Sequence, residues 1–313
     1  MDIFICTKPL QLIICIILNK KEFKNKLYIV DSFFDSKNLS TSLTLKKIFY
    51  EVVWFATKDE AFSAASINYP NNIYIDSDVG LLNLISLLKF KSKSYRTDIH
   101  VYEEGIGTYS CNLVAGKFKR LILKSIGAGC NFGGCGLTKK IHVFDKQHYI
   151  NNNLGLSKKV IEIDTGLINW MEANINNIIE IFSPGYKVGV YSNKNTASIY
   201  ISEWVLDLDL IHKIARKGNL YVKIHPHIKD KFEQIFSGEL NVEFFPATLP
   251  AETAIIILLK SYAKVNIYHH NSSCVHYIKS DRVDYINLLS VMNTTQEEKN
   301  YNINAKETLQ KSR

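Results

Sequence analysis

The chain has 313 residues, of which 46% are hydrophobic and 22% are charged. This composition is typical of a globular protein and excludes a disordered tail protein, a collagen-like repeat and a small disulfide-stapled domain. At this length we expect two domains of roughly 150 residues each. Lys and Arg outnumber Asp and Glu by 38 to 30, a net charge of +8, which favours anionic partners such as nucleic acid, phospholipid, nucleotides or acidic sugars.

The first half of the chain alternates short β-branched runs with longer apolar stretches, beginning with a predicted strand over residues 3–6 and a helix over 10–18. This alternation predicts a parallel sheet that is covered by helices on both faces. Further strands are predicted over residues 27–30, 52–55, 73–75, 100–102 and 142–144, and further helices over 43–49, 60–67 and 81–88.

A second series of the same kind follows a break at Ser183-Pro184-Gly185. Its strands are predicted over residues 188–191, 220–224, 242–245, 265–268 and 284–286, and its helices over 198–216, 251–259 and 273–279. The predicted fold class is therefore α/β, with two doubly wound, Rossmann-like domains that face each other across a cleft. We place these domains at residues 1–182 and 183–292 and expect a polar tail over 293–313.

The cysteines and the apolar runs bear on metal binding and on location. Cys130 and Cys135 form one close pair in CNFGGC, and the other four cysteines are scattered. A zinc site normally needs a second pair, so we expect free thiols in a reducing compartment.

No run reaches the roughly 18 apolar residues of a membrane-spanning helix, and no cleavage site follows residues 10–18. We expect a cytoplasmic protein that at most touches the inner face of the cell membrane.

Polar motifs follow several predicted strands, at the edge where an open α/β sheet binds its ligands. The opening IFICTKPLQ (residues 3–11) leads a strand through a proline turn into a helix, and the motif HVYEEG ends in Glu103, Glu104 and a glycine. Adjacent carboxylates repel each other, which raises the proton affinity of one of them and suits a general base. The alternative interpretation is an ordinary acidic turn.

Two further motifs lie in the second half of the chain. His225 ends a predicted strand just before Pro226, and a histidine there titrates near neutral pH and can donate a proton or bind phosphate. A structural histidine is the alternative. Ser272 and Ser273 precede a predicted helix, and two hydroxyls beside free backbone amides suit a phosphate group. A plain helix cap would account for only one of the two serines.

The order of these motifs resembles that of a known family. The acidic-acidic-Gly, His-Pro and Ser-Ser motifs look like those of bacterial sialyltransferases, and IFICTKPLQ is similar to the start of glycosyltransferase family 52, the lipooligosaccharide sialyltransferases. The capsular polysialyltransferases share these motifs. The resemblance implies a two-domain GT-B fold. It also implies an inverting enzyme that moves sialic acid from CMP-sialic acid to a sugar hydroxyl, such as that of galactose, in lipooligosaccharide, O-antigen or capsule.

The resemblance also implies a role for each matching residue. Glu103 would be the base that deprotonates the acceptor, Glu104 would support it, and His225 would protonate the departing phosphate. The donor site would comprise Pro226, Glu252, Ser272 and Ser273, with the serines on the phosphate and Glu252 on the ribose or cytosine. No essential metal or other cofactor is expected. The implied partners are CMP-sialic acid and an oligosaccharide or glycolipid acceptor, not nucleic acid, and a homodimer is left open.

Two alternatives compete with this interpretation. Asp76 and Asp78 in IYIDSDVG look like the Asp-x-Asp with which metal-dependent GT-A glycosyltransferases hold Mg²⁺ or Mn²⁺ and a UDP-sugar, although Asp78 would also serve as the N-cap of the following helix. The other alternative is a basic nucleic-acid-binding protein, because four basic residues cluster in one short segment. A solvated helix face near an acidic glycolipid explains this cluster equally well. The cluster consists of Lys117, Lys119, Arg120 and Lys124.

Overall fold

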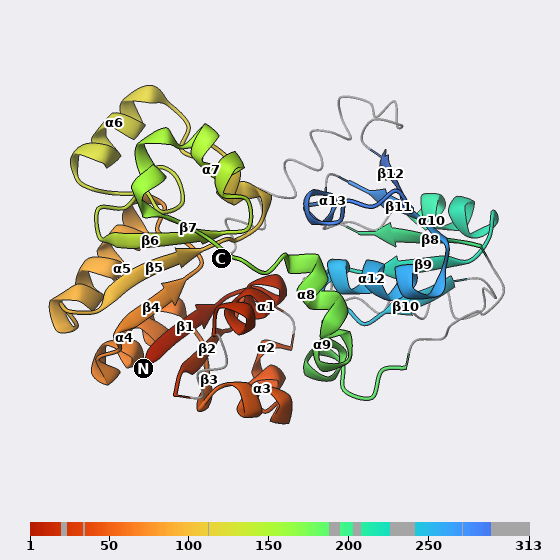
Figure 1. The fold of residues 1–313 in the computed structure, drawn as a ribbon, viewed down its shortest axis with the longest axis horizontal. Helices are drawn as coiled ribbons and strands as arrows, with labels where there is room; N and C mark the ends of the chain where they lie inside the picture. The colour runs from red at the N-terminus through yellow and green to blue at the C-terminus, as the bar shows by residue number, and fades with distance from the viewer. Residues whose placement is uncertain are drawn as a thin grey trace. The chain divides into compact units, whose positions relative to one another are not determined.

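A computed structural model describes residues 1–19, 24–33, 35–111, 113–187, 195–202, 208–225, 242–270 and 272–288. The chain divides into two compact units, Met1–Phe182 (unit 1) and Ser183–Arg313 (unit 2), each built around its own sheet (Figure 1). The strand expected over residues 188–191 and the tail expected over 293–313 lie outside the described residues. No helix among the described residues is long and apolar enough to cross a membrane.

Unit 1 contains a seven-stranded sheet with the strand order β3-β2-β1-β4-β5-β6-β7, and every neighbouring pair is parallel. The β-branched and aromatic residues of these segments favour the extended backbone because they pack well on a pleated surface. The strands are β1 (Asp2–Cys6), β2 (Lys26–Val30), β3 (Glu51–Phe55), β4 (Asn72–Ile75), β5 (Asp98–Tyr102), β6 (Thr138–Val143) and β7 (Val160–Glu162).

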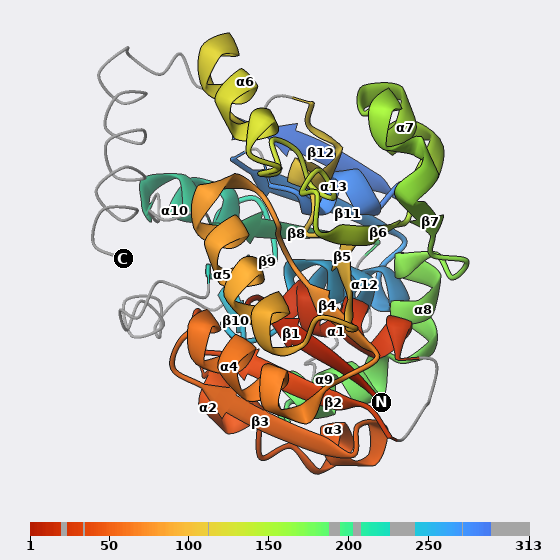
Figure 2. The same cartoon turned by 90° about the vertical axis from the view of Figure 1, so that its left-hand side faces the viewer.

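Helices cover both faces of this sheet. Ile3 and Ile5 of β1 pack in one core cluster with Phe62 and Leu87, so α4 and α5 lie on the face to which the odd-numbered β1 residues point, as Figure 2 shows. The helices of unit 1 are α1 (Pro9–Leu18), α2 (Ser36–Leu39), α3 (Leu43–Ile48), α4 (Lys58–Asn68), α5 (Gly80–Lys93), α6 (Lys117–Ser125), α7 (Lys146–Asn152), α8 (Leu167–Ala173) and α9 (Ile175–Phe182), with 3-10 turns η1 (Ile106–Tyr109) and η2 (Leu154–Lys159).

Local sequence explains where several of these helices begin. Pro9 opens α1, where its fixed φ suits the first helical position and its missing N–H costs no hydrogen bond. The side chain of Ser42 caps α3 by accepting a hydrogen bond from the Leu45 amide, and Thr57 caps α4 in the same way. Because β1 ends at Cys6 and α1 begins at Pro9, Thr7 and Lys8 lie between them at the carboxyl edge of the sheet.

Unit 2 contains a five-stranded parallel sheet with the order β10-β9-β8-β11-β12. The strands are β8 (Thr196–Ile201), β9 (Leu220–Lys223), β10 (Val242–Phe245), β11 (Lys264–His269) and β12 (Val283–Asn287). The described helices are α10 (Leu208–Ala215), α12 (Ala251–Ser261) and α13 (Cys274–Tyr277). The predicted α/β class, with two Rossmann-like domains, is therefore confirmed.

In both sheets the strand order reverses direction at one point, between β1 and β4 in unit 1 and between β8 and β11 in unit 2. Connections on the two sides of such a switch point leave the sheet on opposite faces, which opens a crevice outside the carboxyl ends of the two strands. Ligands of doubly wound folds bind in this crevice. The residues that directly follow β1, β4, β8 and β11 are therefore the first place to look for a functional site.

One predicted element is wrong. The helix expected over residues 198–216 is replaced in its first part by β8, the middle strand of the unit 2 sheet, and only α10 remains helical. Ile199, Tyr200 and Ile201 are all buried because helices and neighbouring strands surround a central strand. A short, fully apolar run of this kind cannot be distinguished from a buried helix by periodicity alone. The edge strand β7 was not predicted.

Candidate functional site

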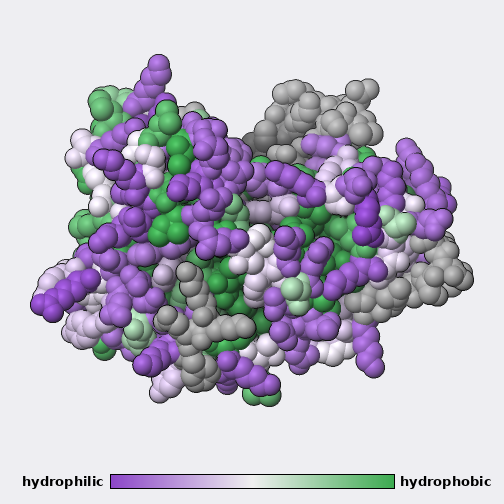
Figure 3. Space-filling model, viewed as in Figure 1, coloured by the Kyte–Doolittle hydropathy of each residue, from purple (hydrophilic) through white to green (hydrophobic). Residues whose placement is uncertain are grey.

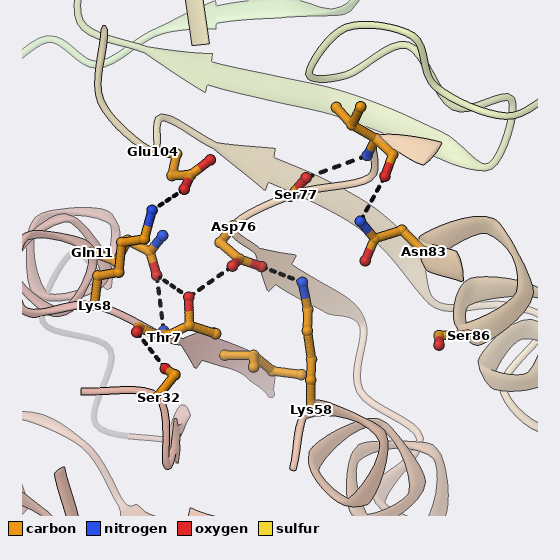
Figure 4. A network of polar contacts seen from close by, with 12 residues as sticks. Thr7, Lys8, Gln11, Ser32, Lys58, Asp76, Ser77, Asn83, Ser86 and Glu104 are labelled. Atoms are coloured by element: carbon orange, nitrogen blue, oxygen red, sulfur yellow. Dashed lines mark hydrogen bonds and ion pairs between the residues drawn. The ribbon is translucent and has the colours of Figure 1, made fainter. Parts of the chain in front are cut away.

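The unit 1 switch point carries a network of polar side chains. Thr7 follows β1 directly, and its hydroxyl oxygen lies 2.8 Å from Oδ2 of Asp76, which follows β4, and 2.8 Å from Oε1 of Gln11 in α1 (Figure 4). The same Gln11 oxygen accepts a hydrogen bond of 2.8 Å from the Thr7 amide. The network therefore joins the ends of two strands that are adjacent in the sheet but 69 residues apart in the chain.

Gln11 brings an unused hydrogen-bond donor to this network. Gln11 is fully buried, and its side-chain Nε2 atom has no hydrogen-bond partner among the described residues. A buried amide donor without a partner costs roughly 1–3 kcal/mol, so such groups are uncommon away from functional sites. Because Gln11 is fully buried, its amide group is shielded from solvent, as Glu103 is.

Two ion pairs complete the unit 1 edge. Lys58 of α4 pairs with Asp76, and Lys8 pairs with Glu104, which lies just beyond β5 (Figure 4). Burial acts to raise the pKa of Asp76, but Lys58, Thr7 and Lys8 outweigh it, so the pKa lies below its usual value and the carboxylate stays ionised. The Lys8 and Glu104 side chains remain 55% and 24% exposed, so this pair can meet a ligand from solution.

The structure separates the two adjacent carboxylates that the sequence presents together. Glu103 is fully buried, and its Oε2 accepts hydrogen bonds from the Tyr109 hydroxyl at 2.5 Å and from the Phe144 amide at 2.8 Å. These bonds fasten η1 and the segment after β6 to the sheet. An acceptor in solution cannot reach Glu103 in this conformation, so the expectation that Glu103 acts as the general base does not fit its surroundings. Glu104 is the carboxylate at the accessible edge.

Asp76 and Asp78 do not form a metal-binding pair. Asp78 is fully buried and accepts hydrogen bonds from the Gly133 amide (2.9 Å), the Cys135 amide (2.9 Å) and the Thr138 hydroxyl (2.6 Å). It thereby anchors the glycine-rich loop between α6 and β6. The expected N-cap role is also wrong, because Val79 caps α5. The described residues contain no cluster of His, Cys, Asp and Glu that could hold a metal ion.

The loop that Asp78 anchors contains the close cysteine pair of the sequence. Cys130 and Cys135 are free thiols and buried, as are Cys6, Cys15 and Cys274, whereas Cys111 is exposed. Burial raises the pKa of the Cys135 thiol, which keeps it neutral. These thiols contribute to packing.

The unit 2 switch point brings together histidine and serine side chains. Ser202 follows β8, and its hydroxyl oxygen accepts a hydrogen bond of 2.7 Å from the His225 amide beyond β9. On the other side of the switch point, Nδ1 of His269, the last residue of β11, accepts a hydrogen bond of 3.2 Å from the Ser272 amide. Nε2 of the next residue, His270, lies 3.3 Å from the Tyr200 hydroxyl oxygen. His225 and Ser272 are thus at the same carboxyl edge, while Pro226 lies outside the described residues.

The predicted phosphate site at the start of a helix is weaker than the sequence indicates. The helix after Ser273 is α13, which has only four residues and no side-chain cap, so its dipole is small. The Ser272 hydroxyl lies 3.2 Å from the Cys274 sulfur. Hydroxyl and imidazole groups, rather than a helix end, therefore supply most of the polarity at this edge.

Glu252 and Lys223 form a buried charged pair beside the unit 2 edge. Glu252, in the first turn of α12, is only 5% exposed, and burial raises its pKa. Lys223 ends β9 and is 3% exposed, and burial lowers its pKa to about 7 against the attraction of Glu252. Its ammonium donates hydrogen bonds to the backbone carbonyls of Ile224 (2.6 Å) and Ala247 (3.1 Å). Glu252 therefore lies near the expected nucleotide site but is not exposed to solvent.

Sequence reasoning missed several residues at both edges. Thr7, Gln11 and Lys58 lie in segments that read as ordinary helix starts, and only the sheet topology brings them to Asp76. Ser202 was hidden because its segment was predicted to be helical. Lys223 carried a usable signal, since a charged residue inside the apolar run LYVKI needs a buried partner.

Solved structures share this fold. The UDP-GlcNAc 2-epimerase of Neisseria meningitidis bound to UDP-GlcNAc is 13% identical, with a TM-score of 0.51, over 95% of this chain and 84% of that chain. The UDP-GlcNAc 2-epimerase of Methanocaldococcus jannaschii in complex with UDP-GlcNAc and UDP is 10% identical, with a TM-score of 0.50, over 94% of both chains. At these identities the likeness shows the fold. No family model and no curated protein sequence matches the chain.

These comparisons contradict the resemblance to glycosyltransferase family 52 and the sialyltransferase activity that it implied. The structures that share the fold are UDP-GlcNAc 2-epimerases, solved with UDP-GlcNAc or UDP and not with CMP-sialic acid, and no family model supports the resemblance. The metal-dependent GT-A alternative has no support either. Each motif is two or three residues long, and doubly wound sheets commonly place carboxylates, histidines and serines after their strands. Order and spacing of such short motifs do not identify a family.

Proposed function

We propose that this chain is an enzyme that processes a UDP-sugar, with UDP-GlcNAc as the first substrate to test. The observation that carries the proposal is the pair of polar clusters at the two switch points, where folds of this class bind ligands. The shared fold of two UDP-GlcNAc 2-epimerases supports the choice of substrate class. Epimerisation at C2 of the sugar is accordingly the first reaction to test.

Charge favours unit 2 as the nucleotide-binding unit. The diphosphate of UDP is anionic, and at the edge of unit 1 the ammonium groups of Lys58 and Lys8 are already paired with the carboxylates of Asp76 and Glu104, so they attract it only weakly. The described edge of unit 2 presents serine hydroxyls and imidazoles, which can donate hydrogen bonds to phosphate oxygens. The nearby carboxylate of Glu252 is buried against Lys223. His225, Ser202 and Ser272 are therefore the proposed phosphate contacts.

The unit 1 edge suits the acid-base part of the chemistry. Sugar hydroxyls are neutral and can hydrogen-bond to carboxylates. Inverting C2 requires that its proton leave while the C–H electron pair forms a C1–C2 double bond and expels UDP from C1. UDP must then add back as a proton reaches C2 from the opposite face, and the partly exposed Glu104 beside Lys8 is the proposed carrier of one of these two protons. Asp76, held ionised by Lys58, has the proposed role of binding a hydroxyl group rather than moving a proton. We propose no metal in these steps, because Asp76 and Asp78 are engaged by protein donors.

The test is to incubate the full chain with UDP-GlcNAc in heavy water, with and without EDTA, and to follow the sugar protons by NMR. C2 epimerisation will give a second anomeric signal and replace the C2 proton with deuterium. Calorimetric titrations with UDP and with CMP measure nucleotide preference independently of turnover, and UDP should bind more tightly. If the protein binds CMP in preference to UDP, or binds neither, the proposal is wrong. Release of UDP without epimerisation would keep the substrate class and reject the epimerase reaction.

A further inference from the structure

The amphipathic helix α6 has its apolar side turned outward. Phe118, Leu121 and Ile122 are 76%, 66% and 47% exposed, and these positions, spaced by three and four residues, share one side of the helix. On the opposite side only Leu123 is buried, at 7% exposure. The apolar stripe of a surface helix normally packs against the core. The outward stripe of α6 therefore lies unpartnered on the surface of unit 1.

The start of α5 extends this apolar surface. The Gly80 amide, at the first residue of α5, donates a hydrogen bond of 2.8 Å to the carbonyl of Gly129, so the start of α5 lies against the loop that follows α6. Figure 3 shows hydrophobic side chains at the surface where Figure 1 draws α6. We call the exposed apolar residues of both helices the α5–α6 face. They are Leu81 (48%), Leu82 (82%), Ile85 (39%), Leu88 (50%), Phe118, Leu121, Ile122 and Ile126 (50%).

The charge on the two helices is basic, although Asp59 of α4 lies beside α5 and accepts a hydrogen bond from Ser86. No Asp or Glu occurs between Glu104 and Asp145, and no acidic residue lies within α5. The basic residues of α6 flank its apolar stripe on both sides of the helix, and the last turns of α5 are also basic. The exposed basic residues of the two helices are Lys89, Lys93, Lys117, Lys119 and Lys124.

We propose that the α5–α6 face docks the protein on an anionic lipid bilayer. An outward apolar stripe with flanking lysines matches a membrane interface, where the apolar side chains enter the acyl boundary and the lysines meet lipid phosphates. A second copy of the chain would bring two basic faces together, and their repulsion disfavours self-association. Duplex nucleic acid would meet the lysines but would leave the apolar stripe exposed to water.

The test uses the full chain and vesicles of phosphatidylcholine, alone or mixed with phosphatidylglycerol, in a co-sedimentation assay. The protein should bind the mixed vesicles and not the neutral ones. The triple variant Lys117→Gln, Lys119→Gln, Lys124→Gln should weaken that binding by roughly 100-fold, since each charge near an anionic surface contributes about a fivefold factor. The double variant Phe118→Ser, Leu121→Ser should weaken it by at least about tenfold while keeping the charge.

A matched control lies on α3 of the same unit. Leu43 is 76% exposed, as Phe118 is, and it stands near the exposed Lys46 and Lys47. The triple variant Leu43→Ser, Lys46→Gln, Lys47→Gln should bind the mixed vesicles as the wild type does. Circular dichroism checks that all variants fold, which we expect because the changed side chains are exposed.

Several results would overturn the proposal. These are equal binding to neutral and anionic vesicles, no binding to either, or α6 variants that bind as well as the α3 control. Sedimentation velocity gives a further decisive outcome. If the wild type is a dimer, the α6 variants are monomers and vesicle binding is absent, the face is covered by a second copy and the membrane proposal is wrong. Because vesicle binding is measured without substrate, these outcomes are independent of the UDP-sugar proposal.

Discussion

Glu103 and Glu104 are neighbours in the chain, yet their surroundings assign them different tasks. Glu103 is buried and accepts hydrogen bonds from Tyr109 and Phe144, whereas Glu104 is partly exposed and pairs with Lys8. A buried acceptor stabilises the fold, and an exposed carboxylate at the ligand edge can transfer a proton. Exchanging each one for an amide separates the two tasks.

We predict that Glu104→Gln lowers turnover of the UDP-sugar by about 10²–10⁴, because an amide cannot take up a proton. Its free energy of unfolding should change by less than about 1 kcal/mol, since the ion pair with Lys8 is exposed. Glu103→Gln should instead lose about 1–3 kcal/mol of stability, because an amide oxygen is a weaker acceptor than a carboxylate oxygen for the hydrogen bonds from Tyr109 and Phe144. Turnover and urea unfolding of both variants provide the check. Full activity in Glu104→Gln would remove this residue from the proposed mechanism.

A second residue-scale prediction concerns the pH dependence of stability. Burial lowers the pKa of Lys223 from 10.5 to about 7 in the folded protein. Between these pH values the unfolded chain therefore binds one proton more than the folded chain, and the free energy of unfolding rises with pH by at most about 1.4 kcal/mol per unit. Below pH ~7 both states hold the proton and Lys223 adds no slope.

The variant Lys223→Met should abolish this part of the slope. Urea unfolding of the wild type and the variant at several pH values between about 7 and 10 measures the difference. Groups that do not interact with Lys223 contribute equally in both proteins and cancel in the comparison, whereas Glu252, whose pKa the Lys223 charge lowers, does not. Identical slopes in the two proteins would mean that Lys223 does not titrate in this window.

At the scale of elements, the glycine-rich loop between α6 and β6 depends on a close approach of backbones. A Cβ on Gly129 would lie 2.7 Å from the Asp78 carbonyl oxygen and 3.1 Å from the Cys135 amide nitrogen. Neither backbone atom can move easily, because Asp78 accepts hydrogen bonds from the Cys135 and Gly133 amides. The loop is therefore packed against the residue that anchors it.

We predict that Gly129→Ala destabilises the protein by about 1–3 kcal/mol, the usual cost of overpacking a tight contact. Gly155, in η2, is a matched control because nothing lies within 4 Å of the Cβ position and its φ is not positive. Gly155→Ala should leave stability within about 0.5 kcal/mol or raise it slightly. Thermal unfolding of both variants gives the comparison. An equal effect of the two substitutions would show that the close contact at Gly129 does not affect the stability of the protein.

The helices and strands also show how much of the fold could be predicted from sequence patterns. Short β-branched runs between helical stretches predicted most of the strands, because alternation of this kind has few other structural solutions. The same rules failed at β8, where burial on both faces removes the period of two. The polar residues at the carboxyl edges of the sheets were predictable in general terms, since polar residues after strands are visible in the sequence. The contact between Thr7 and Asp76 was not predictable, because it depends on the strand order β1-β4 and not on spacing along the chain.

At the scale of the whole molecule, the two sheets repeat one topology but differ in the chemistry of their switch points. Unit 1 has carboxylates paired with lysines, and unit 2 has serines and histidines. An anionic ligand that chooses between the two edges should therefore choose unit 2. Hydrogen exchange of the full chain can locate the bound nucleotide, because a bound ligand slows the opening of the backbone that it contacts.

We predict that saturating UDP slows amide exchange in unit 2 at the residues after β8, β9 and β11, which include Ser202, His225 and Ser272. The residues after β1 and β4 in unit 1 should exchange at an unchanged rate, since Lys58 and Lys8 are paired with Asp76 and Glu104 and attract a diphosphate only weakly. The variant Ser202→Ala should weaken UDP binding and reduce the protection, whereas Thr57→Ala, a helix cap in unit 1, should leave both unchanged. Protection at the ends of β1 and β4 instead would assign the nucleotide to unit 1 and reverse the proposed division between the units.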